Sequence, residues 1–176
     1  MRQILIPAFV LLSSLCVGAS FADGPVPRMG ESGEFLELEF QVNGQRSKGS
    51  LPLYRAEAVR YFSAGVGIEE RSAEYPPFSL KLVFTAGGKP FLAGVAVTIQ
   101  PATGGPPDQH SPQDQVNGPW LFVELPSGTY HVTAIHAART QGLKGVKLEA
   151  GKTKTVHLRW SEDRVSAVQS GEAVGQ

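Results

Sequence analysis

Histidines are the residues of this chain best suited to hold a metal ion or to move protons. His131 and His157 each lie in a segment of alternating apolar residues, so neighbouring strands could bring their imidazoles together. His131 and His136 are an odd number of positions apart and fall on opposite faces of a regular strand. The sequence places no third histidine or carboxylate beside the first pair. We therefore expect solvent-facing strand histidines, with a periplasmic metal-binding protein acting through His131 and His157 as the alternative.

A second candidate metal cluster lies in the Pro- and Gly-rich stretch 101–118, where His110 is close to Asp108 and Asp114. Loops of this length that lack structure of their own are usually recognition segments or disordered. The Gln, Asp and Pro content favours disorder, and a recognition loop is the alternative. We assign no metal site and no cofactor.

No motif in the sequence predicts catalysis. A nucleophile elbow, an HExxH zinc motif and a P-loop are all absent. Residues 65–67 (Gly-Val-Gly) are too short for a dinucleotide fingerprint. Glu69 and Glu70 are adjacent, so in a helix they would point about 100° apart instead of converging as an acid–base pair. We expect these two acids to begin a short helix, with an acidic interaction edge as the alternative, and we expect no enzymatic activity.

The charge balance excludes an electrostatic footprint for nucleic acid. The chain has 16 Lys and Arg against 16 Asp and Glu, without a basic stripe. Cys16 is the only cysteine and lies in the N-terminal apolar segment. If this segment is cleaved off as a signal peptide, the remaining chain has neither a disulfide nor a thiol nucleophile. Packing alone must then stabilise it.

Residues 1–22 have the three parts of a secretory signal peptide: Arg2, an apolar run over 4–17, and small residues before the cleavage point. We predict cleavage between Ala22 and Asp23, and hence a periplasmic or secreted bacterial protein. A retained anchor is the alternative, but the apolar run is short for a span, and we expect no membrane span in the mature chain.

Alternating apolar residues predict short strands separated by turn signals, and little helix. The expected strands lie in 36–42, 78–85, 95–100, 120–124, 130–134, 142–148 and 153–160. Their spacing of 8–12 residues favours an antiparallel sandwich over βαβ units.

The N-terminal part is less regular. Asn43-Gly44 predicts a tight hairpin turn, but the polar return arm 45–53 contains Pro52, which argues against a well-formed second strand. Residues 53–75 are compatible with either helix or strand. A turn at Gly65–Gly67 would lead into the short helix.

The segment from 118 to 132 predicts two strands joined by a sharp corner. Leu125 and Pro126 enter the corner, Gly128 allows a positive φ, and Tyr130 can bury its ring while its hydroxyl reaches a nearby backbone group. We expect the aromatic residues here to be core residues, with an exposed platform for sugar or peptide as the alternative. The six residues of this fold signature are Trp120, Phe122, Leu125, Pro126, Gly128 and Tyr130.

Several of these motifs resemble those of a known domain family. Residues 78–160 resemble the carboxypeptidase regulatory-like domain, a transthyretin-like β-sandwich, through the strand at 92–97, the aromatic strand at 118–122, the corner at 125–130 and the hairpin at 147–156. The resemblance implies a non-catalytic accessory or interaction domain. The transthyretin-like hydroxyisourate hydrolases end in Tyr-Arg-Gly-Ser, which this chain lacks. Residues 65–70 also resemble a segment found in small exported proteobacterial proteins.

Together these observations predict an all-β protein: an antiparallel β-sandwich of about seven strands with a short N-terminal strand and helix extension. The expected division is a signal peptide (1–22), a flexible leader (23–33), the extension (34–77), the sandwich (78–160) and a disordered tail (161–176). We expect the protein to bind a protein or glycan partner in the cell envelope. An accessory domain of a hydrolase is a further alternative.

Overall fold

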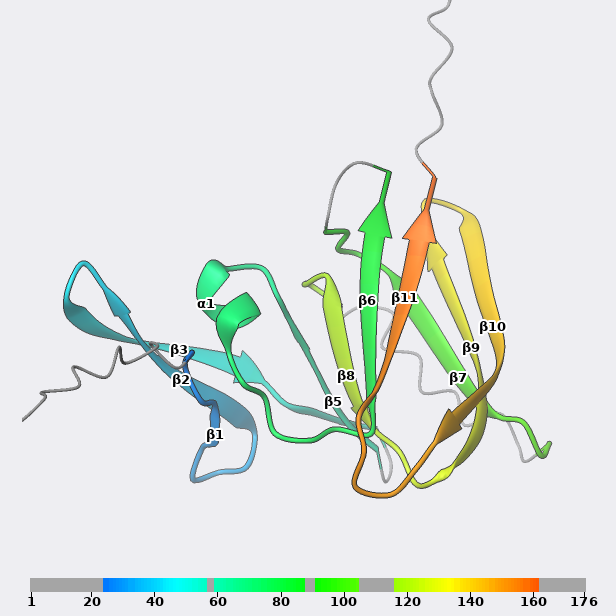
Figure 1. The fold of residues 1–176 in the computed structure, drawn as a ribbon, viewed down its shortest axis with the longest axis horizontal. Helices are drawn as coiled ribbons and strands as arrows, with labels where there is room; N and C mark the ends of the chain where they lie inside the picture. Colours follow the sequence, from blue (N-terminus) through cyan, green and yellow to red (C-terminus); the bar gives the residue numbers. More distant parts are fainter. Residues whose placement is uncertain (1–23, 57–58, 88–90, 105–115, 162–176) are drawn as a thin grey trace, which may run out of the picture.

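The computed structural model describes residues 24–56, 59–87, 91–104 and 116–161. These residues form two packed sheets and a third, smaller sheet that extends from them (Figure 1), which confirms the predicted all-β sandwich. The elements are β1 (Arg28–Met29), β2 (Phe35–Val42), β3 (Gln45–Pro52), β4 (Tyr54–Ala56), β5 (Val59–Ala64), α1 (Ile68–Ser72), β6 (Leu80–Ala86), β7 (Ala96–Pro101), β8 (Trp120–Glu124), β9 (Gly128–His136), β10 (Arg139–Leu148) and β11 (Lys154–Trp160).

The two sheets of the sandwich have the strand orders β11-β6-β8-β5-β4 and β10-β9-β7. Among the strand pairs of the described residues, β11 and β6 are parallel and the others are antiparallel. The parallel pair differs from the purely antiparallel sandwich predicted from the sequence. It arises because the chain leaves one sheet after β10 and enters the other as β11, in the same direction as β6.

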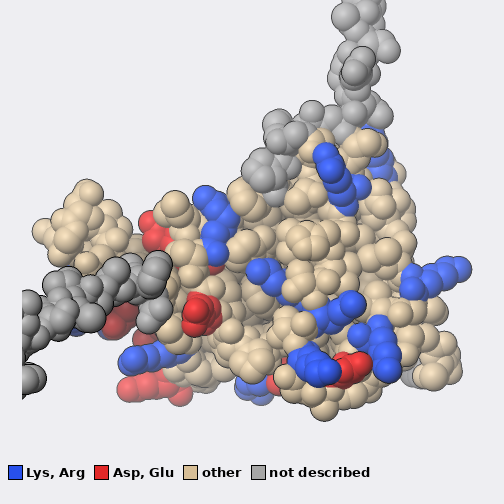
Figure 2. All heavy atoms as spheres, viewed as in Figure 1, with Lys and Arg blue, Asp and Glu red and all other residues tan. Residues whose placement is uncertain are grey.

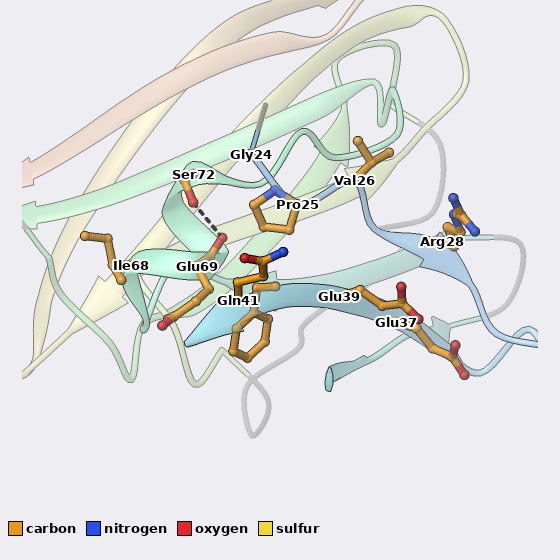
Figure 3. Close-up of a pocket in the computed structure, with 11 residues that line it drawn as sticks. Gly24, Pro25, Val26, Arg28, Glu37, Glu39, Gln41, Ile68, Glu69 and Ser72 are labelled. Carbon is orange, nitrogen blue, oxygen red and sulfur yellow. Dashed lines mark hydrogen bonds between the residues drawn. The ribbon is translucent and has the colours of Figure 1, made fainter. Parts of the chain in front are cut away.

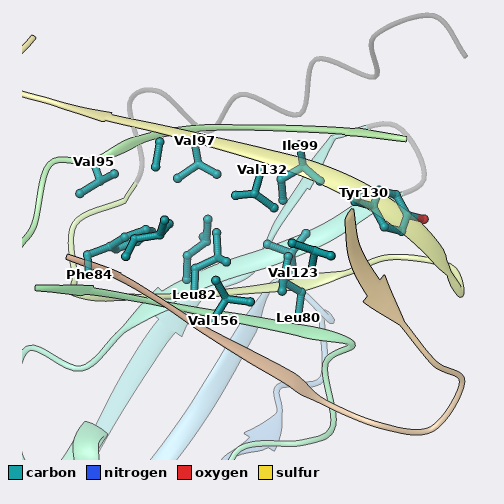
Figure 4. Packing of buried hydrophobic residues seen from close by; sticks show 14 of the residues in the cluster. Leu80, Leu82, Phe84, Val95, Val97, Ile99, Val123, Tyr130, Val132 and Val156 are labelled. Atoms are coloured by element: carbon teal, nitrogen blue, oxygen red, sulfur yellow. The ribbon is translucent and has the colours of Figure 1, made fainter. Parts of the chain in front are cut away.

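The main core fills the space between the two sheets (Figure 4). Val95, Val97 and Ile99 are at most 2% exposed, and the alternate residues Val156, Leu158 and Trp160 of β11 are also buried. Period-2 alternation explains this pattern, because every second side chain on each strand faces the opposite sheet. Each fully buried aliphatic side chain contributes roughly 1.5–3 kcal/mol to folding.

A second core lies on the other face of the five-stranded sheet. There Phe62 and Phe122 stack with ring centroids 4.6 Å apart, and Leu36 and Leu38 of the hairpin cover them. Phe122 is buried in this second core and the half-buried Trp120 packs against it, so both belong to the core, as predicted. The central strands are thus buried on both faces, which fixes the β1–β2–β3 sheet to the sandwich.

The N-terminal part is more regular than the sequence indicates. The turn residues Asn43 and Gly44 have φ of 51° and 79°, as the hairpin prediction requires. β3 pairs with the whole of β2 despite Pro52, because proline occupies the last position of the strand. The leader expected to be flexible contains β1, and 53–75 contains both strands and a helix.

The predicted corner is present. The Tyr130 hydroxyl donates a hydrogen bond to the Pro126 carbonyl at 2.9 Å, and Leu125 is buried beside it. Gly128, however, is not among the glycines with positive φ. A Cβ at Gly128 would lie 3.3 Å from the Tyr130 ring, so a larger residue there would crowd that ring.

Several predictions fall outside the described residues: the signal peptide with its Ala22–Asp23 cleavage point, and the tail from 162 onward. Within the described ranges, no helix is long and apolar enough to cross a membrane.

Candidate functional site

The structure separates the two histidines of the metal hypothesis. His131 lies on β9 and His157 on β11, in different sheets. The residues flanking each histidine point into the core, so the imidazoles lie on opposite outer faces of the sandwich. His131 Nδ1 instead accepts the N–H of Gly145 at 3.3 Å, at a bulge in β10. The pair cannot share a metal ion within one molecule.

The other predicted cluster, around His110, lies outside the described residues, as does most of 101–118. In the part of the chain that is described, no three His, Cys, Asp or Glu side chains are grouped as metal ligands.

Side-chain hydrogen bonds hold a surface turn at residues 65–71, which we call the clamped turn. Glu70 Oε2 accepts the backbone N–H of Gly65 at 2.7 Å and that of Val66 at 3.0 Å. Arg71 Nη1 donates to the carbonyls of the same two residues, at 3.2 and 2.8 Å. The adjacent acid and base therefore close the turn from both sides through charge-assisted hydrogen bonds.

Glycine is required at the start of the clamped turn. Gly65 has φ of 96°, which favours glycine, and a Cβ there would lie 2.9 Å from the Trp120 ring. The turn and short helix were predicted correctly, but the role of Glu70 was not. A Gly-x-Gly sequence followed closely by Glu-Arg was the signal that could have indicated it.

The clamped turn holds two apolar side chains in solvent. Val66 is 65% exposed and Ile68 is 69% exposed. Phe91 is 40% exposed, and the Arg71 guanidinium lies 4.7 Å from the centroid of its ring. Exposed apolar side chains grouped on one surface mark a candidate protein-binding site.

A groove of about 790 Å³ separates the clamped turn and α1 from the N-terminal sheet (Figure 3). Figure 3 shows Ile68 and Glu69 of α1 on one side and Glu37 and Glu39 of β2 on another. The lining residues are Gly24, Pro25, Val26, Arg28, Glu37, Glu39, Phe40, Gln41, Ile68, Glu69 and Ser72.

The groove has an acidic lining, with three glutamates against Arg28. Glu39 also forms an ion pair with Lys48 at 3.2 Å, and the hydrogen bond from Lys48 lowers the pKa of Glu39. On the face shown in Figure 2, basic side chains predominate over the sandwich and acidic side chains gather around the N-terminal part. With Glu39 paired to Lys48, Glu37 and Glu69 remain against Arg28, and this small excess of acidic groups favours a ligand with positive charge.

The leader residues 24–26 form one wall of the groove and are held there by close packing. A Cβ at Gly24 would lie 1.9 Å from the Ser72 carbonyl oxygen, so only glycine fits there. The Glu74 N–H donates to the Pro25 carbonyl at 3.1 Å. These contacts hold 24–26 against the end of α1 and away from β2.

Lys81 covers the aromatic residues on which the platform alternative depends. Its Nζ is 3.5 Å from the Trp120 ring centroid and 5.1 Å from that of Phe122. Burial lowers the pKa of Lys81. A sugar stacking on Trp120 would have to displace this ammonium group and its cation–π interaction. Sequence reasoning did not find this contact, because Lys81 has the position of an ordinary outward strand residue.

Comparisons with known proteins do not identify a family. No family model matches the chain, and no curated protein matches it. Among solved structures, the chain is similar to the Bacillus anthracis TIE protein at 12% identity and a TM-score of 0.32, over 81% of this chain and 40% of that one. The chain thus spans less than half the length of that protein, and a likeness this weak carries no argument.

Proposed function

We propose that this protein is an exported, non-catalytic β-sandwich module that binds a protein partner in the cell envelope. The observation that carries the proposal is the clamped turn, which holds Val66 and Ile68 in solvent beside an acidic groove. Four hydrogen bonds fix the turn in this exposed conformation, so little conformational entropy would be lost when a partner covers it.

Two further observations support the proposal. The N-terminal sequence is typical of export, and the resemblance of 78–160 to the carboxypeptidase regulatory-like domain favours an interaction module over an enzyme. A protein partner is favoured over a glycan because the side chain of Lys81 covers the face of Trp120.

Affinity capture from the native cell envelope tests the proposal. The mature chain 23–176 is immobilised, recovered proteins are identified by mass spectrometry, and the main partner is purified. The test variant is Val66→Asp/Ile68→Asp, which places charge on the clamped turn. The matched control is Ile135→Asp/Leu143→Asp. These two residues are 40% and 37% exposed and lie on the β10-β9-β7 sheet.

We expect a near-stoichiometric partner that the wild type and the control retain and the test variant loses. Equal recovery by both variants would contradict a binding surface at the clamped turn. Recovery of no partner above background would contradict the proposed function itself.

A further inference from the structure

One edge of β2 is open where it borders the groove. β1 pairs only with Leu36 and Glu37, and the Gly30 N–H then bonds to the Phe35 carbonyl at 2.9 Å. β2 itself continues to Val42. Among the described residues, no strand pairs with this edge beyond Glu37. Natural sheets normally cover or shorten such an edge.

The hairpin register shows which backbone groups the open edge presents. In a two-residue hairpin, the residues flanking the turn, Val42 and Gln45 here, form a hydrogen-bonded pair. Hydrogen bonding to β3 then involves every second residue of β2. Glu39 and Gln41 are the residues between, so their backbone N–H and C=O groups point away from β3, toward the open edge. Both of these residues line the groove.

We propose that the open edge receives an extended strand of the partner protein, which continues the line of β1 and pairs with Glu39 and Gln41. This inference rests on the proposed function, because it assigns the binding mode of the same partner. The open stretch from Leu38 to Val42 is about 17 Å long and would pair with roughly five residues. Main-chain hydrogen bonds would give such a strand its affinity.

The groove also defines the side chains of that strand. Alternate residues of an added strand point to opposite faces. Apolar side chains suit the exposed Val26 and Ile68, and basic side chains suit Glu37 and Glu69. The strand should therefore alternate apolar residues with Lys or Arg. A second copy of this chain fits less well, because antiparallel pairing of two β2 edges would bring glutamates together.

The chain's own leader leaves this space open. Residues 24–26 precede β1 and would extend it along β2, but their contacts with 72–74 hold them on the other side of the groove (Figure 3). The partner strand would fill the gap between the leader and β2.

Defined peptides test the inference on the mature chain. The probe is Ac-Val-Lys-Val-Thr-Val-Lys-Val-NH₂, and its matched control carries Glu in place of both Lys. We expect the basic peptide to slow amide exchange of Glu39 and Gln41 at least about tenfold at saturation. We expect the acidic peptide to bind at least about fivefold more weakly.

Backbone methylation distinguishes strand addition from other modes of binding. Two further peptides carry N-methyl groups on the Val residues or on the Lys and Thr residues. Only one of these two sets can face β2, so one peptide should bind like the parent and the other should not bind. In the protein, Gln41→Pro removes one donor from the open edge, and Gln41→Thr retains it. The proline variant should bind the probe at least about tenfold more weakly than the threonine variant.

Unchanged exchange at Glu39 and Gln41 with the basic peptide, or equal binding of the two methylated peptides, would overturn strand addition. If the Val66→Asp/Ile68→Asp variant still loses the partner in that case, partner binding stands and only its mode is wrong. If that variant also retains the partner, both proposals fail.

Discussion

Glu70 and Gly65 are joined by a hydrogen bond from the Gly65 backbone N–H to the Glu70 carboxylate, 2.7 Å long. This bond closes a turn whose first residue has a positive φ and packs against Trp120. The exposed Val66 and Ile68 keep their positions because of this closure. The proposed binding surface therefore depends on an acid that itself points into the turn.

Replacing Glu70 by Ala should open the clamped turn. The change leaves the N–H groups of Gly65 and Val66 without their acceptor, and charge-assisted hydrogen bonds typically contribute about 1.5–3 kcal/mol. We expect the amides of both residues to exchange at least about tenfold faster, as measured by NMR. Glu69→Ala is the control and should change these rates little. Equal rates in the two variants would show that Glu70 does not hold the turn.

Tyr75→Phe should stabilise the protein at neutral pH. The Tyr75 hydroxyl is buried without a hydrogen-bond partner in the described structure. Its ring packs on Phe62 and Phe122, with centroid-to-centroid distances of 5.2 and 4.8 Å. A buried unsatisfied polar group costs about 1–3 kcal/mol, and phenylalanine keeps the ring contacts. Urea denaturation at pH 7 should show a gain of about 1 kcal/mol, whereas a loss would indicate that the hydroxyl has a partner.

The same substitution should change the alkaline limit of stability. Burial raises the pKa of Tyr75, and the negative charge of Glu70 raises it further. Above about pH 10, the unfolded chain releases this proton and the folded chain keeps it, so stability falls as pH rises. Tyr75→Phe should remove this contribution, and its advantage over the wild type should grow between pH 9 and pH 11. A difference that stays constant with pH would contradict the shift.

The β9–β10 turn offers a stabilising substitution. Ala137 and Ala138 have φ of 47° and 61°, in the left-handed region. Residues with a Cβ are disfavoured there by roughly 1–2 kcal/mol, whereas Asn-Gly suits such a hairpin turn. We expect Ala137→Asn/Ala138→Gly to raise the free energy of unfolding by about 1 kcal/mol. Calorimetry should show a higher Tm, and a lower Tm would contradict the turn geometry.

Tyr130→Phe should destabilise the corner. The substitution removes the hydrogen bond to the Pro126 carbonyl and keeps the buried ring. A single neutral hydrogen bond of this kind contributes about 0.5–1.5 kcal/mol, measurable by urea denaturation. An unchanged midpoint would show that the bond adds nothing to stability.

The sequence predicted the features that depend on local pattern. The corner around Tyr130, the turn at Asn43-Gly44 and the strand expected at 153–160 follow from turn chemistry and from alternation along one strand. Features that depend on distant parts of the chain were not predicted. The sheet that β11 joins decides whether His157 can meet His131, and no local pattern encodes that choice.

The candidate site was missed for a related reason. Glu70 and Arg71 look like an ordinary charged helix start, and only the folded turn shows that both bond back to residues 65 and 66. The open edge of β2 depends on where β1 begins, and a strand of two residues has no sequence signal.

The most direct test of partner binding is the affinity of the purified partner for three forms of the mature chain, measured by isothermal titration calorimetry. We expect Val66→Asp/Ile68→Asp to weaken binding at least about tenfold relative to wild type, since the contact would bury each new carboxylate without a partner. Ile135→Asp/Leu143→Asp should leave the affinity unchanged. Equal affinities for all three forms would contradict the clamped turn as the binding surface.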